Sequence, residues 1–129
     1  MYVVIVGCGQ TGSRLAESLS NDKNNIVVVD SEPHAFDVLG DRFNGSTICG
    51  HAMDTVVLER AGIKSADRVY VLTGDEDLNI VVGQIAKKVY AVPSVVIQVS
   101  SFYKDYLFSR KGLYTINKSK VLLTELKNV

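Results

Sequence analysis

The chain has 129 residues, 47% of them hydrophobic, and its 14 basic side chains balance its 14 acidic ones. This composition is typical of a single folded domain, residues 1–129, whose core needs no disulfide or metal. Zero net charge argues against broad nucleic-acid binding, which requires a basic face. The longest uncharged stretch, residues 89–103, contains a proline and is shorter than the roughly 20 apolar residues of a membrane span. Because the only cysteines are Cys8 and Cys49, we expect a reducing cytosolic setting and no disulfide framework.

Short apolar runs alternate with helical patterns along the whole chain. Continuous runs rich in Val and Ile are typical of strands covered on both faces, and helical spacing follows each run. This alternation predicts right-handed βαβ units. The expected fold class is therefore α/β, a Rossmann-type doubly wound parallel sheet of six strands with helices on both faces. The expected strands cover residues 2–6, 26–29, 46–49, 69–72, 95–99 and 113–116. A helix is expected after each strand: the first follows the turn at 7–12, the second begins at residue 33, and the others cover 56–61, 78–89, 102–110 and 118–129.

Individual residues mark the ends of two of these helices. Thr55 is the expected N-cap of the helix over 56–61, and Gly62 is its natural stop. The last helix carries an apolar face, with Leu122 and Leu126, that has nothing obvious to pack on. Two interpretations stay open: the chain is part of a larger protein, or the helix lies on the sheet.

A glycine-rich turn follows the first strand, with the pattern G-x-G-x-x-G at Gly7, Gly9 and Gly12. Gly7 permits the tight turn, Gly9 lets the backbone approach a pyrophosphate, and Gly12 lets the helix lie close to the strand. The helix N-terminus then offers free N–H groups and a positive dipole to phosphates. Between a buried strand and a helix, this turn predicts a dinucleotide site.

An acidic residue completes the fingerprint. Asp30 ends the second strand, 18 residues after Gly12, where it can accept hydrogen bonds from ribose hydroxyls. Its carboxylate would repel a 2′-phosphate, and the neighbouring Ser31 supplies no cation, so we expect NAD or an adenine nucleotide rather than NADP. A Walker P-loop is excluded, because Ser13 and Arg14 follow the last glycine instead of Lys and Ser or Thr.

Further motifs accompany the turn. Gly50-His-Ala-Met-Asp54 follows the third strand, Leu58-Glu-Arg-Ala-Gly-Ile63 precedes Ala66-Asp67, and Thr73-Gly-Asp-Glu-Asp-Leu-Asn79 follows the fourth strand. The last two are the most diagnostic. Together with the fingerprint, these motifs cover nearly the whole chain, which resembles the N-terminal domain of the regulator-of-potassium-conductance family, also called the TrkA-N or KTN domain.

The resemblance implies a regulatory role without catalysis. Such domains gate or control integral-membrane potassium channels or transporters, and lie in the cytoplasm at the inner face of the membrane through that partner. They bind NAD(H), ATP, ADP or AMP, and assemble as homo- or hetero-oligomers, from dimers to octameric rings that nucleotide exchange reshapes. No metal, nucleic acid or direct membrane insertion is implied.

The resemblance also assigns site residues. It places phosphates on the glycine turn, the ribose on the end of the second strand, adenine after the third strand, and the second half of the ligand after the fourth. The expected cofactor-binding residues are Gly7, Gly9, Gln10, Thr11, Gly12, Asp30, Ser31, His51, Ala52, Thr73, Gly74, Asp75, Asn79 and Gln98.

Three of these positions depart from the family pattern. The family often has Arg at the position of Gln10, usually has Asp at that of His51, and usually has Arg at that of Gln98. The two missing cations predict weaker phosphate binding, because charge-assisted phosphate bonds are about twice as strong as neutral ones.

Other residues admit a functional and a plain interpretation. Tyr114 and Lys118 match the Tyr-x-x-x-Lys pair of short-chain dehydrogenases, but Tyr114 falls in a strand, so we treat the match as coincidence. His34 is expected at the surface. For His51, stacking on adenine and filling the turn stay equally open. Cys8 is expected to be a small filler, with a redox thiol of lowered pKa as the alternative.

Several clusters are also ambiguous. Cys49 is expected to be buried and inert. The acidic run Asp75-Glu-Asp77 fits the N-terminus of a helix better than a metal site, because no His or Cys accompanies it. The helices over 78–89 and 102–110 are apolar on more than one face, which favours contacts between subunits.

Three functions remain. The first is a nucleotide-sensing regulatory subunit, favoured because no acid, base or nucleophile accompanies the fingerprint. The second is the cofactor half of an NAD-dependent dehydrogenase. The third is a structural ring subunit with a vestigial crevice.

Overall fold

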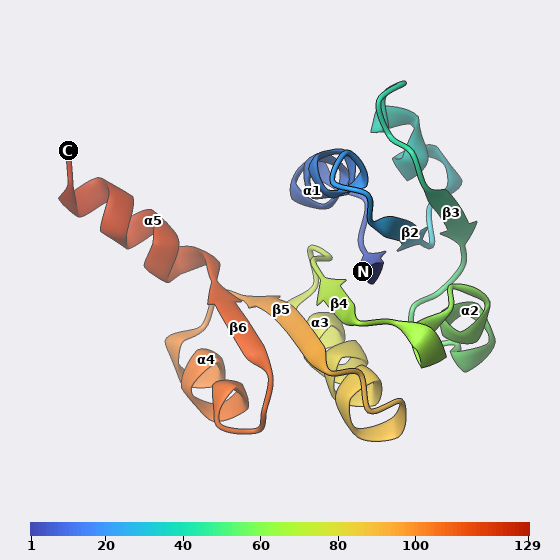
Figure 1. The fold of residues 1–129 in the computed structure, drawn as a ribbon. Helices are drawn as coiled ribbons and strands as arrows, with labels where there is room; N and C mark the ends of the chain where they lie inside the picture. Colours follow the sequence, from blue (N-terminus) through green and yellow to red (C-terminus); the bar gives the residue numbers. More distant parts are fainter.

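The structure, a computed structural model, describes residues 1–129. Six strands form one sheet in the order β3-β2-β1-β4-β5-β6, and every neighbouring pair is parallel (Figure 1). This confirms the predicted Rossmann-type sheet, and each predicted strand end is within one residue of the observed one. The strands are β1 (Tyr2–Val6), β2 (Asn25–Asp30), β3 (Ser46–Cys49), β4 (Arg68–Val71), β5 (Ser94–Val99) and β6 (Tyr114–Asn117).

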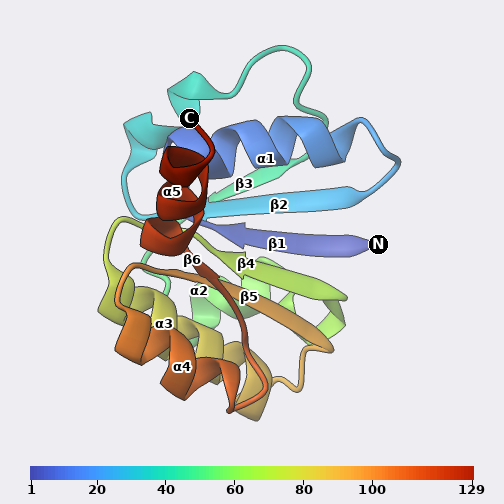
Figure 2. The same ribbon diagram turned by 90° about the vertical axis from the view of Figure 1, so that its left-hand side faces the viewer.

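Helices cover both faces of the sheet (Figures 1 and 2). On one face lie α1 and the 3₁₀ turn η1; on the other lie α2, α3 and α4. The strand order reverses between β1 and β4, because β2 and β3 are added on one side of β1 and β4 to β6 on the other. The connections that follow β1 and β4 therefore lie on opposite faces of the sheet and leave a crevice at the carboxyl ends of these strands. The helices are α1 (Gln10–Ser20), α2 (Thr55–Arg60), α3 (Glu76–Gln84), α4 (Phe102–Ser109) and α5 (Lys118–Lys127), with the short turns η1 (Pro33–Val38), η2 (Ile63–Ser65) and η3 (Ile85–Val89).

The core lies on both faces of β1, whose side chains alternate between two clusters. Val4 and Val6 belong to a cluster of 20 buried residues under α2 and α3, and Val3 and Ile5 belong to one of six under α1. This alternation follows from the two-residue period of a strand. Buried on both faces, β1 is a fixed base for the glycine turn at its end.

Three helix predictions need correction. The helix expected from residue 33 is only the 3₁₀ turn η1, because Leu39 is extended (ψ 123°) and a glycine follows it; the spaced apolar residues still pack against the smaller core cluster. Asp54, not Thr55, caps α2, since its side chain accepts the Val56 N–H at 2.9 Å. The helix expected over 78–89 ends as an α-helix at Gln84 and closes with the π turn η3. Gly62 does end its helix, with φ +87°.

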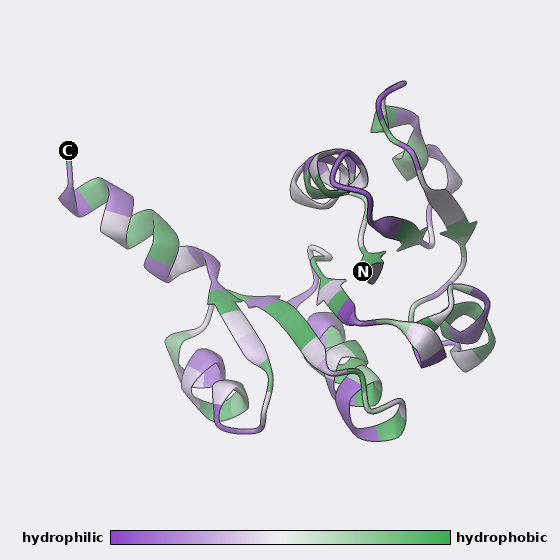
Figure 3. Cartoon of the chain, viewed as in Figure 1, coloured by the Kyte–Doolittle hydropathy of each residue, from purple (hydrophilic) through white to green (hydrophobic).

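The last helix, α5, projects away from the sheet (Figure 1). Apolar and polar residues alternate along it (Figure 3), and Leu122, on its expected apolar face, is 59% exposed. The interpretation that this helix lies on the sheet of its own chain is therefore wrong. None of the helices combines the length and apolarity that crossing a bilayer would require.

Candidate functional site

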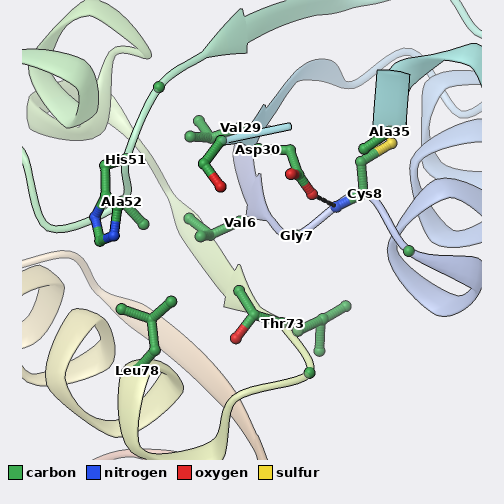
Figure 4. Close-up of a pocket in the computed structure, with 15 residues that line it drawn as sticks. Val6, Gly7, Cys8, Val29, Asp30, Ala35, His51, Ala52, Thr73 and Leu78 are labelled. Atoms are coloured by element: carbon green, nitrogen blue, oxygen red, sulfur yellow. Dashed lines mark hydrogen bonds between the residues drawn. The ribbon is translucent and has the colours of Figure 1, made fainter. Parts of the chain in front are cut away.

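A crevice of about 340 Å³ opens at the carboxyl ends of β1, β2, β3 and β4 (Figure 4). Ligands of doubly wound proteins bind at this edge, where the strand order reverses, and the volume falls in the usual range for small-molecule sites. The lining consists of Val6, Gly7, Cys8, Gly9, Val29, Asp30, Ser31, Ala35, Gly50, His51, Ala52, Leu72, Thr73, Gly74 and Leu78.

The glycine turn forms one wall, and its glycines meet different surroundings. Gly7 has φ +109°, and a Cβ there would lie 2.9 Å from the backbone of Leu72 and Thr73. A Cβ on Gly12 would lie 1.9 Å from the Gly7 carbonyl oxygen, so only glycine lets α1 approach β1 this closely. A Cβ on Gly9 would meet nothing within 4 Å, because it would point into open space.

The N-terminus of α1 differs from those of the other α-helices. Its N-cap is Gly9, without a side-chain hydrogen bond, and the N–H groups of Gln10, Thr11 and Gly12 make no hydrogen bond within the chain. Such free donors, with the helix dipole behind them, suit an anion. The other four helices are capped by the side chains of Asp54, Asp75, Ser101 and Asn117.

Asp30 joins the end of β2 to the glycine turn. Its Oδ2 accepts the Cys8 N–H at 2.8 Å (Figure 4), and its Oδ1 accepts the Glu32 N–H at 2.9 Å. A carboxylate offers about four lone-pair directions, so these two bonds leave room for ribose hydroxyls. The two N–H groups therefore hold the carboxylate beside the crevice with acceptor capacity to spare.

The segment after β3 forms the opposite wall. His51 lines the crevice (Figure 4), and its Nδ1 accepts the Met53 N–H at 3.2 Å. The two interpretations of His51 are thus compatible, because the ring both closes the turn and borders the open space. Gly50 is required here, since a Cβ would lie 2.5 Å from a methyl group of Val57.

The loop after β4 is held from below by Asn79, which is only 1% exposed. The Asn79 amide donates to the carbonyl oxygens of Gln98 at 2.9 Å and Thr73 at 3.1 Å. Its oxygen accepts the Thr73 N–H at 3.0 Å and the Thr73 hydroxyl. Asn79 is therefore a positioning residue, which fixes the wall of the crevice without lining it.

The structure brings eight of the fourteen predicted residues into the crevice lining: Gly7, Gly9, Asp30, Ser31, His51, Ala52, Thr73 and Gly74. Gly12 and Asn79 are buried and do not line it, and Asp75 caps α3 by accepting the N–H groups of Asp77 and Leu78. Gln10 lines a neighbouring hollow, and Thr11 and Gln98 line another on the α1 side of β4, β5 and β6.

Sequence reasoning did not assign Ala35 and Leu78 to the site, although both line it. Each lies near the start of a segment after a strand, so only the meeting of the loops at one sheet edge reveals it. Gly50 belongs to the motif after the third strand. Its structural role, leaving room for the Val57 side chain, depends on a tertiary contact that the sequence pattern does not indicate.

The expectation for Cys8 stands, and the one for Cys49 needs correction. Burial, and the negative charges of Asp30 and Glu17, raise the pKa of the Cys8 thiol, so the alternative of a lowered pKa is wrong and filler is the better interpretation. Cys49, expected to be buried, is exposed because β3 is the edge strand.

The acidic run at the start of α3 has structural partners. The Ser101 and Ser100 N–H groups, with the nearby ammonium of Lys104, hold the pKa of Glu76 below its ordinary value. Lys104 also bonds Asp77 at 2.8 Å. No group of three or more His, Cys, Asp or Glu residues in the molecule could hold a metal ion.

These features define a Rossmann-type domain with a dinucleotide-binding fingerprint. The chain matches the family model of the TrkA-N domain over residues 3–118, and therefore belongs to the TrkA-N domain family.

Two relatives are named Trk system potassium uptake protein TrkA. The protein from Streptomyces coelicolor is 29% identical over 116 residues, which are 90% of this chain and 52% of that protein. The protein from Halomonas elongata is 32% identical over 114 residues, 88% of this chain and 24% of that protein. This chain thus spans about half or less of the length of these relatives.

Solved structures share the fold. The TrkA-N domain of the inner membrane protein ybaL from Escherichia coli superposes with a TM-score of 0.86 at 15% identity, covering 98% of this chain and 94% of that one. The GsuK channel bound to NAD superposes with a TM-score of 0.83 at 21% identity, covering 98% of this chain and 22% of the channel chain. The Kef C-terminal domain from Shewanella denitrificans, in its AMP-bound form, gives 0.80 at 22% identity, covering 98% and 77%.

Proposed function

We propose that this domain is the nucleotide-binding regulatory part of a potassium channel or transporter, and that it performs no chemistry. One observation carries the proposal: the uncapped N-terminus of α1 and the anchored carboxylate of Asp30 face the same crevice. Membership of the TrkA-N family and the names of the relatives support the link to potassium uptake.

The ligand in this proposal is NAD(H) or an adenine nucleotide (ATP, ADP or AMP). Structures of the same fold with NAD and AMP support this choice. Phosphates would accept the free N–H groups of the glycine turn, the ribose would bond Asp30 and Ser31, and adenine would lie by His51 and Ala52. The second half of a dinucleotide would follow Thr73 and Gly74, with Asp75, Asn79 and Gln98 holding that wall in place.

The expected partner is an integral-membrane channel or transporter, with this domain on its cytoplasmic side. Nucleotide binding would then bias a homo- or hetero-oligomer, up to an octameric ring, between two shapes. A ligand shifts such an equilibrium only when its affinity differs between the shapes, so the crevice would have to change on assembly.

Exposed apolar surfaces support assembly. Three aromatic residues of α4, Phe102, Tyr103 and Tyr106, are more than half exposed, and Tyr103 is 70% exposed. A largely apolar hollow of about 370 Å³ lies over β4, β5 and β6, next to α1, where no helix of the chain covers the sheet. Contiguous apolar patches on a folded domain usually mark protein contacts.

We expect small-angle scattering to report an oligomer whose profile changes when its nucleotide is added. Replacing Tyr103 and Tyr106 by Ser should lower the oligomeric mass, because both rings would lose apolar contacts with another subunit. The exchange Ser18→Ala on the exposed side of α1 is the control. A profile that is the same with and without every nucleotide tested would contradict sensing and favour the structural ring subunit.

Calorimetric titration with NAD, NADH, ATP, ADP and AMP tests the site itself. We expect at least one of the five to bind, and Asp30→Ala to weaken that binding by about 10- to 100-fold, since hydrogen bonds to a charged group contribute about 1.5–3 kcal/mol. Asp41→Ala removes an exposed carboxylate far from the crevice lining and should change nothing. No binding by any of the five would refute the proposal; hydride transfer by the longer protein would favour the dehydrogenase.

A further inference from the structure

The crevice carries a negative charge next to the place where a nucleotide's phosphates would lie. Its lining includes Asp30 and contains no Lys or Arg. The Asp30 Oδ2 is 2.8 Å from the backbone nitrogen of Cys8, which is part of the glycine turn. The carboxylate is thus in direct contact with the turn that would receive the phosphates.

Nearby cations do not offset this charge. Arg14 lines the neighbouring hollow, but Glu17 lines the same hollow. Lys104 of α4 is 2.8 Å from a carboxylate oxygen of Asp77 and 3.8 Å from one of Glu76. Arg14 and Lys104 therefore each have an acidic neighbour.

The Cys8 thiol reports the same negative environment. After burial, the negative charges of Asp30 and Glu17 are the causes that raise its pKa. The thiol belongs to the glycine turn, so these charges also act on any anion bound there.

The attraction for phosphate comes from neutral donors. The N–H groups of Gln10, Thr11 and Gly12 are free, and the α1 dipole adds the equivalent of about half a positive charge. The free N–H groups and the helix dipole suit phosphodiesters, which carry one negative charge each. A terminal phosphate carries up to two charges near neutral pH and would add repulsion from Asp30.

We propose that this crevice selects nucleotides by phosphate charge. It favours NAD and ADP-ribose, whose second phosphate is esterified to a ribose, over ADP and ATP, which end in a terminal phosphate. The inference rests on the proposed nucleotide site and names the class of ligand that the site prefers. ADP-ribose and ADP are the decisive pair, because they share adenosine and two phosphates, and a ribose cap removes the extra charge from the second phosphate.

The test is calorimetric titration of the whole chain with NAD, ADP-ribose, ADP and ATP, in a chelator that removes divalent cations. At pH about 8, where terminal phosphates are doubly charged, we expect ADP to bind about three- to tenfold more weakly than ADP-ribose, and ATP more weakly still. Raising the salt concentration from about 0.03 M to about 0.3 M should bring the ADP and ADP-ribose affinities closer together, because added ions screen the repulsion between Asp30 and the terminal phosphate.

Two variants separate charge from shape. Glu17→Gln removes a negative charge and keeps an oxygen that can accept the Gly40 N–H, now bonded at 2.9 Å. Gln10→Arg adds a positive charge at the exposed first position of α1. Both should strengthen ADP and ATP binding more than ADP-ribose binding. Ser18→Arg, at an exposed position near the C-terminal end of α1, adds the same positive charge farther from the glycine turn and should change the ratio of ADP to ADP-ribose affinity less.

The outcomes distinguish the two proposals. Binding of none of the four ligands would overturn the nucleotide site and this inference together. ADP or ATP binding as tightly as ADP-ribose would overturn the charge selection alone. A preference for ADP-ribose could also stay unchanged with salt, in Glu17→Gln and in Gln10→Arg. That result would assign the preference to the shape of the ligand and would overturn the charge selection.

Discussion

Replacing Gly12 by Ala is expected to destabilise the domain by more than about 3 kcal/mol, because the new methyl group overlaps a backbone atom. The Cβ would lie 1.9 Å from the Gly7 carbonyl oxygen and 3.7 Å from a methyl group of Ile5. Neither neighbour can move freely, since β1 is buried on both faces. Urea denaturation followed by circular dichroism measures the loss, and α1 would have to move away from the sheet for the variant to fold.

The same substitution at Gly9 is the matched control, because its Cβ would meet nothing within 4 Å. Its stability should stay within about 1 kcal/mol of the parent, the usual range for changes at an N-cap. Nucleotide binding should nevertheless weaken at least about tenfold, since the methyl group would occupy space next to free N–H donors. Full stability of Gly12→Ala, or unchanged affinity of Gly9→Ala, would contradict the roles assigned to these glycines.

Asn79→Leu is expected to cost about 3 kcal/mol or more, although the two side chains are similar in size. The change leaves the Gln98 carbonyl oxygen and both backbone groups of Thr73 without their partner. Each buried group left unsatisfied costs about 1–3 kcal/mol. Because Thr73 lines the crevice, NAD affinity should also fall under conditions in which the variant remains folded.

Gln84→Leu, on the same helix, is the control for Asn79→Leu. The Gln84 side chain is half-buried and makes no hydrogen bond, so this exchange should change the free energy of unfolding by less than about 0.5 kcal/mol. Hydrogen exchange at the Thr73 N–H gives a second readout, and should accelerate only in Asn79→Leu. Protection that is unchanged there would show that the loop after β4 does not depend on Asn79.

Agreement between predicted and observed elements depends on how strongly the local sequence pattern specifies each one. The ends of β1, β2 and β5 agree within one residue because their β-branched runs are buried on both faces of a parallel sheet. The prediction of a helix from residue 33 was wrong because apolar spacing does not distinguish an α-helix from a 3₁₀ turn: Phe36 in the turn and Leu39 at its end both pack against the smaller core cluster. Thr55 was a reasonable cap by residue type, but the neighbouring Asp54 also suits that position and its backbone is extended there.

By itself, the sequence determined the fold class, the glycine turn, the acidic residue at the end of the second strand and the family, because these depend on local pattern and spacing. Only the tertiary structure decided which residues share the crevice. It placed Asp30 against the Cys8 N–H, buried Asn79 beneath the loop after β4, left the α1 N-terminus uncapped and exposed Cys49 on an edge strand. Contacts between residues far apart in the chain depend on how the sheet edge gathers its loops, and no local spacing encodes that geometry.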